Sequence, residues 1–230
     1  MQGVVNALNR NIKNLRPGKA LEVGCGTGRW LNLFDPGEVK IYGLDYSKGM
    51  LLEASKLKIA GLIRGDANAL PFKNNLFDLT YCVNAIHHFN DDEKFILDSK
   101  KYLQHGGALI IIGLDHHEEL MDWYIYDYFN GTCEFDKLRF SSFTLLKKKM
   151  LEAGYSNINI EIIDRVDITR LGTEIFSDPF LEKDQSSQLA ALSQEEYTCG
   201  IDKMRAAIKN NPLQEFRVRF SVKMMKGFAS

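Results

Sequence analysis

The chain has 230 residues, of which 45% are hydrophobic and 26% are charged, so it is long enough to bury one substantial core. Its formal net charge of −1 lacks the basic excess of nucleic-acid binders, and we expect no nucleic-acid partner. No apolar run approaches the ~20 residues of a membrane span, and no charged-then-apolar leader opens the chain. The four cysteines form no Cys-x-x-Cys pair, as expected of reduced thiols in the cytoplasm.

Helix and strand patterns alternate along the first half of the chain. After an amphipathic helix within residues 1–18, we predict strands at residues 19–23, 39–44, 61–64, 77–84 and 108–114. Between them we predict helices at residues 29–34, 48–57 (capped by Ser47) and 91–103, and a turn at residues 105–107. The last strand is a continuous apolar run, which is typical of a parallel sheet buried on both faces. This alternation predicts a doubly wound α/β fold.

The second half has a different pattern. A helix at residues 142–153 ends at Gly154, and apolar residues of period two predict strands at 158–163 and 216–225. Between these strands lie a mostly polar insert, residues 164–193, and a helix at 194–210. We therefore expect one domain over residues 1–230, composed of the N-terminal helix, a half at 19–114 and a half at 115–230.

The segment from Leu21 to Gly28 reads Leu-Glu-Val-Gly-Cys-Gly-Thr-Gly and lies between a predicted strand and a predicted helix. A glycine turn there lets the backbone approach a ligand closely. Asp45 ends the next strand, where a carboxylate can accept hydrogen bonds from both hydroxyls of a ribose. The spacing G-x-G-x-G, followed by the bulky Trp30, departs from the G-x-G-x-x-G of NAD and FAD enzymes. The pattern predicts a nucleoside-bearing cofactor other than a dinucleotide.

The residues from Glu22 to Gly28 resemble motif I of the class I S-adenosylmethionine-dependent methyltransferases. The resemblance covers residues 19–114 and is closest to the small-molecule enzymes of the ubiquinone and menaquinone biosynthesis type. It continues through the segments 43–47, 65–67, 70–72, 77–78, 84–88 and 103–107. It implies a Rossmann-like seven-stranded sheet of order 3-2-1-4-5-7-6 with an antiparallel strand seven. It also implies S-adenosyl-L-methionine as the cofactor and S-adenosyl-L-homocysteine as the product.

The resemblance also implies a set of cofactor-binding residues within the half at 19–114. Asp45 would bind the ribose, and Asp66 would accept a hydrogen bond from the adenine amino group. The alternative for Asp66 is a cap on its own turn, and Glu22 could simply satisfy loop amides. The implied cofactor-binding residues are Glu22, Gly24, Gly26, Gly28, Asp45, Tyr46, Asp66, Ala67, Asn84 and Ala85.

The half at 115–230 is expected to bind the methyl acceptor. His88 is a candidate base, because histidine titrates near neutrality, although it could be a packed side chain. Tyr124, Tyr128 and Arg139 are candidates for acceptor binding; the alternatives are a packed aromatic core and an arginine paired with a nearby acid. A group formed by His87, His88, Asp115, His116 and His117 could in principle bind a metal, but its spacing matches no known set of metal ligands, and we assign no metal site.

We therefore expect methyl transfer to a small-molecule acceptor, with the insert at 164–193 closing over the pocket as a lid. The alternatives are a non-catalytic S-adenosylmethionine-binding sensor or scaffold and, on weaker grounds, an NAD-linked dehydrogenase. The sequence specifies neither the acceptor, nor whether oxygen, nitrogen or carbon is methylated, nor the oligomeric state.

Overall fold

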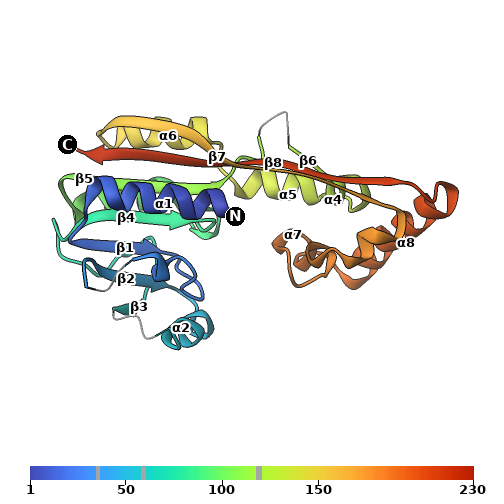
Figure 1. Ribbon diagram of the computed structural model, residues 1–230, viewed down its shortest axis with the longest axis horizontal. Helices are drawn as coiled ribbons and strands as arrows, with labels where there is room; N and C mark the ends of the chain where they lie inside the picture. Colours follow the sequence, from blue (N-terminus) through green and yellow to red (C-terminus); the bar gives the residue numbers. More distant parts are fainter. Residues whose placement is uncertain (35–36, 58–60, 118–120) are drawn as a thin grey trace. The chain divides into compact units, whose positions relative to one another are not determined.

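Figure 1 shows a computed structural model, which describes residues 1–34, 37–57, 61–117 and 121–230. The chain divides into two compact units: residues 1–114, 141–164 and 222–230 form unit 1, and residues 115–140 and 165–221 form unit 2. The division differs from the two expected halves, because two segments of the second half complete unit 1. The single domain over residues 1–230 stays a prediction.

The sheet has the predicted strand order (Figure 1). The parallel strands β1 (Lys19–Val23), β2 (Lys40–Asp45), β3 (Leu62–Arg64), β4 (Phe77–Val83) and β5 (Leu103–Leu114) lie in the order β3-β2-β1-β4-β5. Strand β8 (Glu215–Ala229) runs antiparallel to β5, and β7 (Tyr155–Leu171) pairs with β8. In the part of the chain that the structure describes, the sheet has eight strands instead of seven, because the short β6 (Asp122–Trp123) also pairs with β8. The α/β fold class is confirmed.

Strand β5 is buried as its apolar run predicts, with Ala108 to Ile112 each 0% exposed. The prediction that a turn at residues 105–107 precedes the strand is wrong, because β5 begins at Leu103 and includes these residues. The pairing with β4 is irregular there: Phe77 is opposite Leu103, whereas Leu79 is opposite Ala108. Gly106 has a φ of 79°, a backbone conformation that glycine adopts without steric cost, so the irregularity is accommodated within the strand.

The helices of unit 1 are α1 (Gln2–Leu15), α2 (Lys48–Ser55), α3 (Asp92–Tyr102) and α6 (Phe143–Glu152), with the short η2 (Ile86–His88) after β4. The side chains of Ser47, Asp91 and Ser142 cap α2, α3 and α6 by accepting a hydrogen bond from a backbone N–H of the first turn. None of the described helices combines the length and apolar character that crossing a membrane requires.

The helix predicted at residues 29–34 is wrong in extent. Only a single 3₁₀ turn, η1 (Leu31–Leu33), follows the glycine loop. Gly28 has a φ of 79°, which lies outside the right-handed helical range, and Arg29 and Trp30 lie in the turn that follows it. Among the described residues, the glycine loop is therefore followed by one 3₁₀ turn and not by a long helix.

Unit 2 contains β6, α4 (Tyr124–Tyr128), α5 (Thr132–Arg139), η3 (Gly172–Ser177), η4 (Pro179–Leu181), α7 (Ser187–Ala190) and α8 (Gln194–Asn210). Helix α8 has the predicted bounds and begins at a capping box formed by Ser193 and Glu196. The unit has its own apolar core, which includes Trp123, Tyr124 and Phe129.

The insert at residues 164–193 is more regular than predicted. Its first residues continue β7 as far as Leu171, because the apolar alternation of the strand extends beyond Ile163. Ile175, Leu181 and Leu189 are at most 5% exposed and belong to the core of unit 2. These side chains pack inside the unit, so the segment has the burial of a core rather than that of a separate lid.

Candidate active site

The glycine loop leaves β1 at Val23 and turns sharply. Gly24, Gly26 and Gly28 all have positive φ, at 72°, 53° and 79°. A Cβ on Gly24 would lie 2.5 Å from the Cβ of Ala85, whereas a Cβ on Gly26 would meet nothing within 4 Å. Only glycine fits the loop at position 24, and at position 26 the backbone is open to a ligand.

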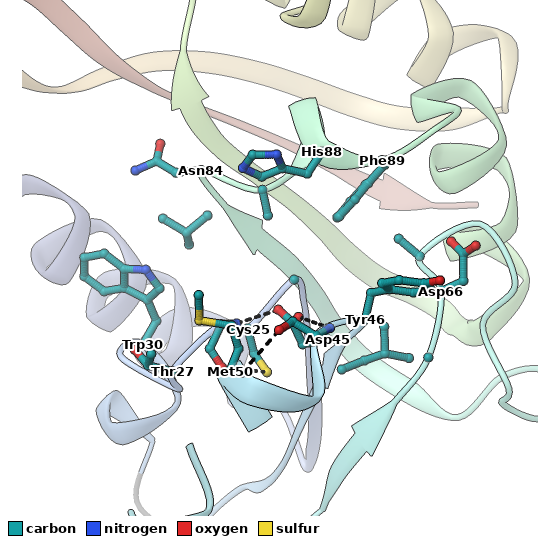
Figure 2. Close-up of a pocket in the computed structure, with 18 of the residues that line it drawn as sticks. Cys25, Thr27, Trp30, Asp45, Tyr46, Met50, Asp66, Asn84, His88 and Phe89 are labelled. Carbon is teal, nitrogen blue, oxygen red and sulfur yellow. Dashed lines mark hydrogen bonds between the residues drawn. The ribbon is translucent and has the colours of Figure 1, made fainter. Parts of the chain in front are cut away.

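Asp45 ends β2 directly opposite this loop (Figure 2). Its Oδ2 accepts a hydrogen bond from the backbone N–H of Gly26 at 2.8 Å, and its Oδ1 accepts one from the N–H of Ser47, also at 2.8 Å. Two backbone donors thus fix the carboxylate from opposite sides. Each carboxylate oxygen has a second acceptor site, so Asp45 can hold the loop and still bind hydroxyl groups.

A pocket of about 760 Å³ lies over the loop and Asp45. Ligand pockets typically have volumes of about 300–1,000 Å³. Every residue that the sequence implicated in cofactor binding lines this pocket except Glu22 and Gly28, and His88 lines it too. Figure 2 shows Asn84 and His88 across the pocket from Asp45. The carboxyl ends of β1, β2 and β4 meet here, at the edge where open α/β sheets bind ligands.

Asn84 follows β4 with a φ of 49°, an uncommon conformation for a residue other than glycine. Its backbone N–H donates to the carbonyl of Ile112 at 2.8 Å, which ties it to β5. This left-handed residue turns the chain from β4 into η2, which carries His88 to the pocket. Strained backbone of this kind is often found at functional sites.

Asp66 caps its own turn and is also a residue of the pocket. Its Oδ1 accepts a hydrogen bond from the N–H of Asn68 at 2.8 Å, which is the predicted turn cap, and the residue also lines the pocket. Tyr46 lines the pocket as well and is 73% exposed, so its ring is open to contact by a flat ligand.

The structure adds pocket residues that were not assigned from the sequence, among them Cys25, Thr27, Trp30, Met50 and Phe89. Trp30 is only 7% exposed, and Arg29 lies over its ring at 4.8 Å. The only sequence signal for Trp30 was its bulk after the third glycine. No sequence pattern indicated that Phe89 lines the pocket, because its position there depends on the turn at Asn84.

Gly28 and Glu22 lie outside the lining. A Cβ on Gly28 would lie 3.0 Å from Leu57 and 3.2 Å from Ala54. The absence of a side chain at Gly28 therefore lets these two residues pack closely against the glycine loop. Glu22 is 0% exposed on β1, and its Oε2 accepts a hydrogen bond from the Tyr81 hydroxyl at 3.2 Å. Burial raises the pKa of Glu22 well above its usual range, and the neighbouring Asp45 raises it further, while the hydrogen bond from Tyr81 opposes the shift.

The three acceptor-binding candidates lie in unit 2 and do not line this pocket. Tyr124 is 1% exposed, and its hydroxyl donates to Asp178, so it has the position of a packed core residue. Tyr128 packs against the Phe216 ring with centroids 5.2 Å apart. Arg139 is paired with Asp136 at 2.9 Å. Tyr124 and Tyr128 thus fit the alternative of a packed aromatic core, and Arg139 fits the alternative of an arginine paired with a nearby acid.

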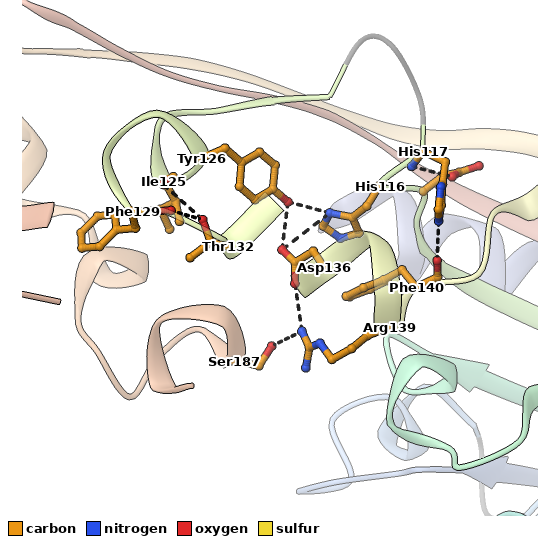
Figure 3. A network of polar contacts seen from close by, with 11 residues as sticks. His116, His117, Ile125, Tyr126, Phe129, Thr132, Asp136, Arg139, Phe140 and Ser187 are labelled. Carbon is orange, nitrogen blue, oxygen red and sulfur yellow. Dashed lines mark hydrogen bonds and ion pairs between the residues drawn. The ribbon is translucent and has the colours of Figure 1, made fainter. Parts of the chain in front are cut away.

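Arg139 belongs to a chain of polar contacts in unit 2 that is buried at His116 and Asp136 and reaches the surface at Ser187 (Figure 3). His116 Nδ1 lies 2.7 Å from the Tyr126 hydroxyl, which donates to Asp136, and Arg139 donates to Asp136 and to Ser187. Burial lowers the pKa of His116. Within residues 1–34, 37–57, 61–117 and 121–230, no group of three or more His, Cys, Asp or Glu side chains is placed to hold a metal ion.

The pocket fits the expected cofactor in shape and chemistry. Asp45 and Asp66 supply acceptors for hydroxyl and amino groups, and Gly26 exposes its backbone to the pocket. Trp30, Met50 and Phe89 supply apolar walls. These residues would hold S-adenosylmethionine, with the ribose at the end of β2.

Comparisons with known proteins agree with this geometry. The family model described as "Methyltransferase domain" matches residues 21–111. The demethylmenaquinone methyltransferase of Bacillus mycoides is 34% identical over 112 residues, which are 44% of this chain and 47% of that protein. An uncharacterised protein of Methanocaldococcus jannaschii is 32% identical over 170 residues, 71% of this chain and 78% of that protein. The crystal structure of a SAM-dependent methyltransferase from Archaeoglobus fulgidus superposes with a TM-score of 0.60 at 14% identity, covering 98% of this chain and 92% of that one.

The chain spans about half the length of the demethylmenaquinone methyltransferase that it matches. The family model covers β1, β2 and β4, and with them the glycine loop, Asp45 and Asn84 of the pocket. This chain therefore belongs to the class I S-adenosylmethionine-dependent methyltransferases.

Proposed function

We propose that this protein transfers a methyl group from S-adenosylmethionine to a small-molecule acceptor. The observation that supports this most strongly is the Asp45 carboxylate, which two backbone N–H groups hold at the mouth of the open glycine loop. A carboxylate fixed in this way is preorganised for the two hydroxyls of a ribose, so little ordering remains to be done on binding.

The remaining pocket residues suggest a direction for the bound cofactor. Asp66 uses Oδ1 in its own turn, and its Oδ2 is suited to an exocyclic amino group of the adenine. The exposed Tyr46 ring would lie against the adenine, and the N–H of Ala67 would donate to it. Asn84 and Ala85 would then contact the methionine end, with Gly24 and Gly26 beneath it.

The chemistry asks little of the protein beyond placement. When bound, the sulfonium supplies an already electrophilic methyl group. The residues around it need to align the acceptor atom with the sulfur–carbon bond and to exclude water, which is catalysis by positioning. His88 lines the same pocket on the Asn84 side, and we propose that it takes a proton from a hydroxyl or amine acceptor.

A small-molecule acceptor is favoured because the pocket is concave and its walls are largely apolar. The relatives named for demethylmenaquinone methylation match less than half of this chain, so we do not transfer their substrate to it. We do not extend the proposed acceptor site to Tyr124 and Arg139, whose polar atoms already bind Asp178 and Asp136. A cytoplasmic location is proposed from the four free cysteines.

The test is transfer of an isotopically labelled methyl group. The purified protein is incubated with methyl-labelled S-adenosylmethionine and pooled small molecules that bear phenol, hydroxyl, amine or activated carbon groups. We expect label in one acceptor class and stoichiometric S-adenosylhomocysteine. Tight cofactor binding without transfer to any member of the pools would instead favour a sensor or scaffold.

A further inference from the structure

A buried acid lies beneath the cofactor loop and is not used by the proposed reaction. Glu22 is the fourth residue of β1, two residues before Gly24, and its side chain is 0% exposed. Its Oε2 accepts a hydrogen bond from Tyr81 on the adjacent strand, while its Oε1 is buried without a hydrogen-bond partner among the described residues. A carboxylate in this position would have one oxygen desolvated and uncompensated, which is costly.

The groups around Glu22 do not offer it a positive charge. Tyr81 donates to it and the Cys82 thiol acts on it from β4, while Asp45 acts on it from β2 and the Cys25 thiol from the loop. Burial raises the pKa of Cys25 to about 12 and that of Tyr81 well above its usual range, so both are neutral near pH 7. Asp45 is an acid, and within the described part of the chain no lysine or arginine forms an ion pair with Glu22. This surrounding favours a protonated, neutral Glu22.

The cofactor brings the charge that the site lacks. S-adenosylmethionine has a permanent sulfonium cation, and the product S-adenosylhomocysteine has a neutral thioether at the same atom. We infer that Glu22 is protonated in the free protein and releases its proton when S-adenosylmethionine binds, but not when S-adenosylhomocysteine binds. The inference rests on the proposed function, because it requires the sulfonium to lie over the glycine loop.

The proton balance is simple. The O–H bond of the Glu22 carboxyl breaks, the electron pair stays on the carboxylate, and the proton passes to the buffer. The new carboxylate and the sulfonium then stabilise each other in a poorly solvated site. Methyl transfer removes the positive charge, so Glu22 takes a proton back as the product forms. Glu22 would thereby favour binding of the substrate form of the cofactor over the product form.

The test is calorimetry in two buffers of different ionisation enthalpy at the same pH, because the difference in binding heat counts the protons released. Because burial raises the pKa of Glu22 well above its usual range, the titrations are made at several values between about pH 6 and pH 8. We expect close to one proton released per S-adenosylmethionine near pH 6. The affinity for this ligand should rise by up to about tenfold per pH unit while release is complete. S-adenosylhomocysteine should show neither effect.

Glu22→Gln keeps the shape of the neutral acid and removes its proton, so it should bind both ligands without this release. Tyr81→Phe is the second variant, in case Glu22→Gln folds poorly. It removes a hydrogen bond that lowers the pKa of Glu22, so proton release should persist to higher pH than in the wild type. Asp98→Asn, on the buried acid of α3, is the matched control and should behave as the wild type does.

The outcomes separate the two claims. Binding of S-adenosylmethionine with no proton release, equal release with both ligands, or unchanged release in Glu22→Gln would overturn the inference and leave the proposed function standing. Absence of any S-adenosylmethionine binding would overturn the proposed function and the inference together. Release that is confined to the sulfonium ligand and lost in Glu22→Gln supports the inference.

Discussion

Replacing Asp45 by alanine should weaken cofactor binding and loosen the glycine loop at the same time. The substitution removes the acceptors of the Gly26 and Ser47 N–H groups, both bound at 2.8 Å, and removes the proposed ribose ligand. Hydrogen bonds to a charged group contribute about 1.5–3 kcal/mol each. Losing one such net interaction with the ribose corresponds to a roughly 10- to 150-fold increase in the Kd for S-adenosylmethionine.

Asp78 is a matched control for Asp45, because it lies near the start of β4, at the edge of the parallel sheet opposite the pocket. Asp78 also accepts hydrogen bonds from two backbone N–H groups, those of Gly18 at 2.9 Å and Lys19 at 2.8 Å, but it does not line the pocket. Asp45→Ala and Asp78→Ala should therefore each lower the free energy of unfolding by about 1–3 kcal/mol. Only Asp45→Ala should change the affinity for S-adenosylmethionine.

The assay combines calorimetric titration with urea unfolding of the wild type and both variants. Destabilisation alone cannot explain a weaker affinity that is seen in one variant and not in the other. Unchanged affinity in Asp45→Ala, or an equal loss of affinity in Asp78→Ala, would refute the assignment of Asp45 to the ribose.

Three further predictions concern the loop, the polar chain of unit 2 and the candidate base. Gly24→Ala places a Cβ 2.5 Å from that of Ala85 at a φ of 72°, so urea unfolding should show a loss of more than about 2 kcal/mol; a smaller loss would mean that the loop relaxes freely. Burial lowers the pKa of His116, so its contribution to stability is complete above about pH 6.5 and is lost as the pH falls toward the lower folded-state value. Thermal melting should therefore show a fall in Tm below about pH 6.5 in the wild type that is absent in His116→Gln, and parallel pH profiles would contradict this. His88→Ala should lower kcat for the identified acceptor while the Kd for S-adenosylmethionine stays within about twofold; unchanged turnover would leave His88 as a packing residue.

The sequence predicted the cofactor-binding strands well because each has a local signal. The apolar run of β5, the cap Ser47 and the glycine spacing after β1 each depend on short segments. Asp45 followed from its place at the end of β2, whereas Asn84 came from the family resemblance. Local patterns were therefore sufficient for the part of the site formed by strand ends.

The errors arose where packing over long sequence distances decides the structure. The polar insert has no period of its own, and Ile175 and Leu189 are buried in a core that also includes residues of β6, α4, α8 and β8. Tyr124 and Arg139 were candidates for ligand binding, yet the Tyr124 hydroxyl donates to the distant Asp178, and Arg139 pairs with Asp136 one turn earlier on α5. Trp30 and Phe89 were missed because their contact with the pocket depends on turns rather than on strand ends.

The most direct test of the central claim is a crystal structure of the protein with S-adenosylhomocysteine. The account predicts one ligand in the pocket over the glycine loop, with both ribose hydroxyls within hydrogen-bonding distance of Asp45, the adenine beside Asp66 and the sulfur on the side of Asn84. A ligand bound elsewhere, or one in this pocket whose ribose does not contact Asp45, would contradict it.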